Sequence, residues 1–107
     1  MGIVSVEKNI KQKFIVVEMV DGQLLLRGDT SVTWHKNILE NLEKDGARIS
    51  KINGGGWIYP EMASRTIYVW DKSTRYGEAE LSIVRDLLSA HFADFKILNK
   101  EPDVACG

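Results

Sequence analysis

An Asp-Gly pair between two apolar runs is the feature that most limits how this chain can fold. The first run covers residues 13–20 and is rich in β-branched side chains, and the second covers residues 23–27. Because a two-residue type I′ turn needs positive φ at both central positions, Asp21-Gly22 favours a hairpin of two antiparallel strands. Side chains alternate along a strand, and with a two-residue turn Lys13 and Arg27 are expected on opposite faces of the sheet.

The segment after this hairpin predicts a helix over residues 31–45 that carries a histidine near its start. Asp29, Thr30 and Ser31 are good N-cap residues, Trp34 begins an apolar stripe at helical spacing, and Gly46 ends the pattern. His35 lies on the side of that stripe. The helix dipole favours its neutral form, which can accept a proton or attack an electrophile. The alternative is a half-buried histidine that only packs and forms local hydrogen bonds.

The remaining segments predict an α/β (α+β) protein with a mixed sheet flanked by two main helices, in the order β-β-α-β-β-α-β. The expected elements are a strand over 47–52, a glycine loop over 53–56, a short extended segment over 57–60, an interior strand over 65–70, a helix over 78–92 and a strand over 95–98. Pro60 limits the short segment to an edge or an end of the sheet. Residues 99–107 are expected to form a mobile tail.

The composition is that of a single globular domain spanning residues 1–107. The net charge of −1 gives no general attraction to nucleic acid or to a membrane, and the apolar runs are far too short to span one. The N-terminus lacks the apolar core of a signal peptide, and Cys106 has no partner for an internal disulfide, so we expect a cytoplasmic monomer. Two histidines and one cysteine argue against a transition-metal site.

Two glycine-containing loops could carry chemistry. Gly54-Gly55-Gly56 matches no phosphate-loop fingerprint; a flexible connector is the simpler interpretation, and a close approach of two backbones is the alternative. The segment 73–77 lies between an interior strand and a helix, so its amides could converge on an anion, with Lys72 and Arg75 adding positive charge. It could equally be an ordinary strand-to-helix connection. If both helices begin at the same end of the sheet, two positive dipole ends and His35 would surround one pocket.

Several short motifs, taken in order from about Lys13 to Leu98, resemble the phosphohistidine phosphatase family, also called the janus/ocnus family. The matching elements are Arg27-Gly28, Trp34-His35-Lys36-Asn37-Ile38, Gly54-Gly55-Gly56, Ile67-Tyr68-Val69-Trp70, and Ser73 with Tyr76-Gly77. No single motif is specific, but the ordered set is. The resemblance implies a small cytosolic phosphatase with a mixed sheet that removes phosphate from phosphohistidine in proteins and needs neither metal nor cofactor.

The resemblance also implies roles for individual residues. His35 would be the catalytic residue, acting as general base or nucleophile, with Arg27 and Lys13 at the substrate. Ser73 and the amide of Arg75 would belong to the loop that holds the phosphoryl oxygens. The other residues expected to bind phosphate are Thr74, Tyr76 and Gly77, and Gly55, Gly56 and Trp57 are candidates for the pocket rim.

Three departures from the family pattern leave substrate preference open. Trp57 stands where the family has an arginine, Arg75 replaces a small residue, and Leu81 replaces a second histidine. The alternative is a phospho-ligand or protein-binding module of the same fold with little turnover.

Overall fold

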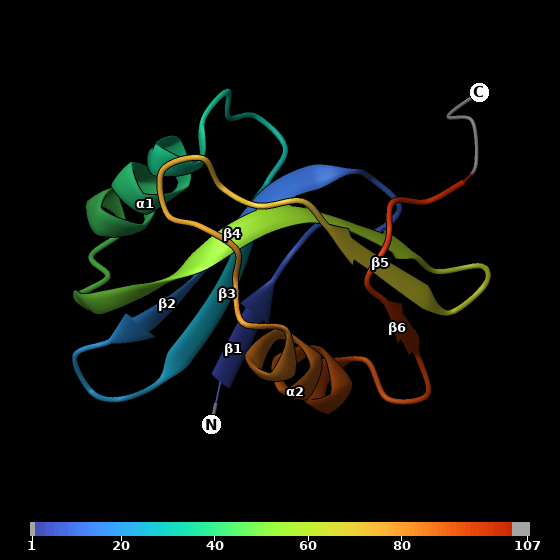
Figure 1. Cartoon of the computed structure of the whole chain (residues 1–107). Coiled ribbons are helices and arrows are strands. Elements are labelled where there is room, and N and C mark those ends of the chain that lie inside the picture. The colour runs from blue at the N-terminus through green and yellow to red at the C-terminus, as the bar shows by residue number, and fades with distance from the viewer. Residues whose placement is uncertain (1, 104–107) are drawn as a thin grey trace.

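A six-stranded mixed sheet with one helix on each face forms the fold of the computed structural model, which describes residues 2–103 (Figure 1). The elements are β1 (Gly2–Ser5), β2 (Gln12–Met19), β3 (Leu24–Asp29), α1 (His35–Lys44), β4 (Ile49–Glu61), β5 (Thr66–Trp70), α2 (Leu81–His91) and β6 (Lys96–Leu98). The strand order is β1-β3-β2-β4-β5-β6. The outer pairs β1/β3 and β5/β6 are parallel, and the other pairs are antiparallel. The predicted mixed sheet with two helices is therefore confirmed.

Alternation along the central strands divides the core into two layers. One face packs against α2 and the other against α1, so the two helices cover opposite faces of the sheet (Figure 1). The fully buried side chains on the α2 side include Phe14, Val16, Leu26, Val84 and Leu88, and those on the α1 side include Ile15, Val17 and Ile38. A pocket shared by both helix starts was expected only if the two helices begin at the same end of the sheet; in the structure they pack on different faces of it.

The β2–β3 hairpin forms as predicted, but its turn has three residues instead of two. The amide of Met19 donates to the carbonyl oxygen of Gln23 at 2.8 Å, which leaves residues 20–22 in the turn. Gly22 donates to the Met19 carbonyl oxygen at 2.9 Å and has a φ of 91°, the combination expected of a type I turn followed by a left-handed glycine.

The extra turn residue changes which side chains share a face. Lys13 pairs with Asp29, and Ile15 pairs with Arg27. Lys13 and Arg27 therefore lie on the same face, the one that α1 covers, and the expectation of opposite faces is wrong.

Strand β4 runs unbroken through the glycine triplet, so the predicted loop over 53–56 and the separate segment over 57–60 are wrong. It is a central strand between β2 and β5, and Pro60 lies at its end, beyond the last residue paired with β2. A Cβ on Gly54 would lie 2.6 Å from the carbonyl carbon of Glu78, and one on Gly55 would lie 2.6 Å from the carbonyl oxygen of Phe14. The triplet thus allows a close backbone approach, the less simple of the two interpretations.

Helix α1 begins at His35, four residues later than predicted. Asp29 does not cap the helix, because its carboxylate accepts the amide and the hydroxyl of Ser31 at 2.9 and 2.7 Å. Trp34 precedes the helix and is 63% exposed, so it does not belong to the apolar stripe. Gly46, with a φ of 94°, follows the end of the helix as predicted.

The ends of the chain differ most from the prediction. Strand β1 was not expected, and it pairs in parallel with β3. Pro102 is buried, so the predicted tail contacts the domain at this residue, while Cys106 lies outside the described residues. In the described part of the chain, neither helix has the length and apolar character that crossing a membrane requires.

Candidate functional site

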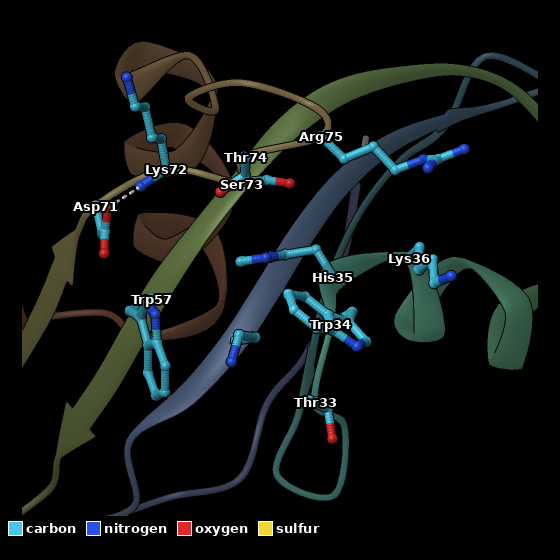
Figure 2. A pocket seen from close by; sticks show the side chains of 11 residues that line it. Thr33, Trp34, His35, Lys36, Trp57, Asp71, Lys72, Ser73, Thr74 and Arg75 are labelled. Carbon is cyan, nitrogen blue, oxygen red and sulfur yellow. Dashed lines mark hydrogen bonds between the residues drawn. The ribbon is translucent and has the colours of Figure 1, made fainter.

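A cavity of about 750 Å³ opens on the α1 side of the sheet, where the start of α1 meets the loop that follows β5 (Figure 2). The start of α1 contributes one wall, the 71–75 loop another, and strands β2 and β4 the floor. The lining residues are Lys13, Thr33, Trp34, His35, Lys36, Trp57, Asp71, Lys72, Ser73, Thr74 and Arg75. The fold therefore brings four separate segments of the chain to one cavity.

His35 is the first residue of α1 and is 8% exposed. Its Nε2–H donates to the carbonyl oxygen of Gly56 at 2.9 Å. A carbonyl can only accept a hydrogen bond, so the proton of the neutral ring is on Nε2 and the lone pair is on Nδ1. A Cβ on Gly55 would lie 3.1 Å from Cδ2 of this ring. The β4 glycines therefore provide both the space for the imidazole and the acceptor that fixes its tautomer.

Burial lowers the pKa of His35 below its ordinary value, and the positive charge of Lys13 lowers it further. The hydrogen bond to Gly56 and the carboxylate of Asp71 act in the opposite direction, but the net shift is downward. This downward shift favours the neutral imidazole expected at pH 7, and burial is its main cause.

The 73–77 loop closes on itself and leaves two amides unused. Ser73 donates to the Gly77 carbonyl oxygen at 3.2 Å and Gly77 donates back at 2.8 Å, while the amide of Tyr76 donates to Oγ of Ser73 at 3.0 Å. Within the described residues, the amides of Thr74 and Arg75 have no hydrogen-bond acceptor. Those two N–H groups are free to bind an anion in the cavity.

The cavity is electropositive, although the whole chain carries a net charge of −1. Its lining includes three lysines and one arginine against the single carboxylate of Asp71. The ammonium of Lys13 lies 4.6 Å from the ring centroid of Trp57, its partner on the neighbouring strand. The cationic residues come from strand β2, helix α1 and the 71–75 loop, although the side chains of Lys72 and Arg75 extend away from the His35 ring (Figure 2).

Arg27 is the main predicted site residue that the structure does not bring to this cavity. Its guanidinium forms an ion pair with Asp45 at 3.2 Å, beyond the C-terminal end of α1, whereas His35 is at the N-terminal end. A helix of 10 residues separates these ends by about 15 Å.

Some of the other predicted residues line the cavity, and the rest support it from outside. Lys13, Ser73, Thr74, Arg75 and Trp57 line the cavity. Tyr76 packs into the core beneath α1, and Gly77 holds the loop to β4 by accepting the Gly55 amide at 3.0 Å. Gly55 and Gly56 lie behind the His35 ring.

The sequence did not indicate Thr33, Trp34, Lys36 or Asp71 as part of the site. The first three adjoin His35 in the chain, but the helix was expected to start earlier, which would have turned them elsewhere. Asp71 directly follows an interior strand, and that position was the one signal available for it. Among residues 2–103 no cluster of three or more metal-binding side chains is present.

A model of the Janus/Ocnus family matches residues 1–96. The chain belongs to the Janus/Ocnus family. It is 36% identical over 84 residues to the sex-regulated protein janus-B of Drosophila teissieri, covering 74% of this chain and 59% of the relative. It is 34% identical over 85 residues to janus-B of Drosophila melanogaster, covering 75% of this chain and 60% of the relative.

A janus-A relative is more distant. The sex-regulated protein janus-A of Drosophila mauritiana is 27% identical over 93 residues, which cover 79% of this chain and 68% of the relative. The chain spans about three fifths of the length of the janus-B relatives that it matches. The matched family segment includes every residue that lines the cavity.

Proposed function

We propose that this chain hydrolyses the P–N bond of phosphohistidine in proteins, with His35 acting at the phosphorus atom. The observation that carries the proposal is the His35 ring, whose Nε2–H is bound to Gly56 and whose Nδ1 has no partner among the described residues. It lines a cavity with four cationic residues and with two backbone amides that have no acceptor within residues 2–103. Amides and positive charges stabilise the negative charge on the three phosphoryl oxygens during transfer. The family resemblance of the sequence motifs points to the same reaction.

His35 can promote cleavage of the P–N bond by either of two mechanisms. As a general base, Nδ1 takes a proton from water while the water oxygen bonds to phosphorus and the P–N bond breaks. As a nucleophile, Nδ1 itself bonds to phosphorus, and water then cleaves this second P–N bond. In either case the electron pair of the original P–N bond goes to the leaving nitrogen.

A second candidate function is phospho-ligand binding with little turnover. The observation that favours it is the ion pair of Arg27 with Asp45. This pair holds Arg27, the arginine expected at the substrate, away from the cavity. Trp57, in place of a family arginine, also leaves the cavity with less bidentate recognition of phosphate.

The test is release of inorganic phosphate from a phosphohistidine peptide, measured in the presence of a strong chelator. Wild type should turn over, and His35→Ala should lose that activity while keeping its circular dichroism spectrum. His91→Ala is the matched control, because that ring is at the end of α2 on the opposite face and donates from Nδ1 to the Leu87 carbonyl oxygen at 3.0 Å. Equal losses in the two variants, or activity only with added divalent cation, would reject the proposed mechanism.

A single-turnover experiment separates the two candidates. With enzyme in excess over peptide, a phosphatase releases phosphate at a rate that saturates with enzyme concentration. A binding module would show saturable binding of the phosphopeptide and no release above the rate without protein.

A further inference from the structure

Among residues 2–103, Asp71 carries the only carboxylate that lines the cavity. It is the first residue after β5 and has a φ of 66°, a conformation that few residues other than glycine adopt, although aspartate tolerates it better than most. Its Oδ1 accepts the amide of Lys72 at 2.8 Å, which leaves Oδ2 for another partner. A carboxylate held in an uncommon backbone conformation at a cavity is a candidate for a functional role.

The position of Asp71 relative to its neighbours limits that role. In the described residues the ion pairs are Arg27–Asp45 and Lys100–Asp103, so none of the four cations of the cavity pairs with Asp71. Asp71 is close enough to His35 to affect the pKa of that ring. Figure 2 shows the His35 ring pointing toward the side of the cavity where Asp71 and Trp57 lie. A substrate whose phosphorus lies beside His35 can therefore place its leaving group on the side of the cavity that Asp71 lines.

We propose that Asp71 selects substrates whose leaving group is a protonated nitrogen, an inference that rests on the proposed function. A carboxylate can accept the N–H of a phosphorylated imidazolium and stabilise its positive charge. The P–N bond then breaks with its electron pair returning to the ring, which departs as neutral imidazole. The same carboxylate opposes the negative charge that develops on the oxygen of an ester leaving group. Asp71 thus favours phosphoramidates over phosphate monoesters.

The substitution that isolates this effect is Asp71→Asn. Asparagine tolerates the positive φ and keeps an oxygen for the Lys72 amide, so the change removes little more than the charge. Asp71→Gly is the second variant, because glycine adopts this φ without strain. Asp21→Asn is the matched control: Asp21 also accepts a backbone amide, that of Gln23 at 3.0 Å, but lies in the β2–β3 turn away from the cavity.

The measurement is the ratio of kcat/KM for a phosphohistidine peptide to kcat/KM for p-nitrophenyl phosphate, with inhibition by phenyl phosphate as a second readout. Both Asp71 variants should lower this ratio by about tenfold, and phenyl phosphate should inhibit them more strongly than wild type. Asp21→Asn should keep the wild-type ratio. An unchanged ratio and unchanged inhibition in an active Asp71→Asn variant would overturn the role of Asp71 alone. Wild type that releases phosphate from neither substrate would overturn the proposed function and this inference together.

Discussion

The tautomer of His35 is fixed by a backbone atom, not by another side chain. The Gly56 carbonyl oxygen accepts Nε2–H at 2.9 Å, so Nδ1 of the neutral ring carries the lone pair. The sequence could predict that His35 and the Ser73–Arg75 loop belong to one site, because they match an ordered set of motifs. It could not predict the hydrogen bond to Gly56, since that contact depends on β4 passing beneath the start of α1.

Activity should fall as the pH drops below about 6.5, the ordinary pKa of a histidine. The neutral ring is the reactive form and burial lowers its pKa, so the inflection should lie on the acid side of that value and the profile should be flat above it. The check is a profile of kcat/KM between pH 5 and 8 at constant ionic strength, about the range in which histidine titrates. An inflection above the ordinary value would contradict a buried, neutral His35.

The free energy of unfolding should also depend on pH through the protonation of His35. The unfolded chain binds a proton on His35 at a higher pH than the folded chain does. The stability that neutral His35 contributes is therefore fully present above about pH 6.5 and is lost as the pH falls toward the folded-state pKa. Chemical denaturation of His35→Gln should lack that part of the pH dependence. Parallel curves for wild type and the variant would show that the ring does not titrate differently on folding.

Lys13 should matter more than Arg27 for anion binding. Lys13→Met keeps the stem beside Trp57 and removes a charge that lines the cavity, so inorganic phosphate should bind about tenfold more weakly, or roughly 1.4 kcal/mol. Arg27→Met removes an ion pair outside the cavity and should leave phosphate affinity close to wild type. Isothermal titration calorimetry gives both values. A larger loss of phosphate affinity with Arg27→Met than with Lys13→Met would show that Arg27 belongs to the anion site.

Strand β4 determines how the elements meet. Its glycines let the 73–79 segment lie beside it, with Gly55 donating to Gly77 at 3.0 Å and accepting from Ala79 at 3.3 Å. Most helices and strands were predictable from apolar periodicity, but this strand was not, because a glycine triplet is equally typical of a loop. The hairpin register was missed for a similar reason: one additional turn residue moves every side chain of a strand to the other face.

Gly55→Ala should therefore destabilise the whole sheet. The new Cβ would meet the Phe14 carbonyl oxygen at 2.6 Å, and backbone cannot yield cheaply, so we expect a loss of about 1–3 kcal/mol in the free energy of unfolding. Lys51→Ala, an exposed change in the same strand, is the control and should stay within about 0.5 kcal/mol of wild type. Urea denaturation measures both variants. Equal stabilities would mean that β4 has room at Gly55 and that the triplet is not required by packing.

At the scale of the whole molecule, the two helices lie on opposite faces and the site forms only on the α1 face (Figure 1). Positive charge gathers there from residues far apart in the sequence, within a chain of net charge −1. The sequence could supply the residue types, but the gathering depends on which face each helix covers. That choice also explains why the start of α2 contributes nothing to the cavity.

Titration of uniformly ¹⁵N-labelled protein with inorganic phosphate tests the location of the anion site without requiring turnover. The amide signals of Thr74 and Arg75 and the ring signals of His35 should shift together along one saturation curve. The signals of Arg27 and Asp45 should stay in place. Saturable shifts at Arg27 and Asp45, with Thr74, Arg75 and His35 unmoved, would show that the site has been assigned to the wrong end of α1.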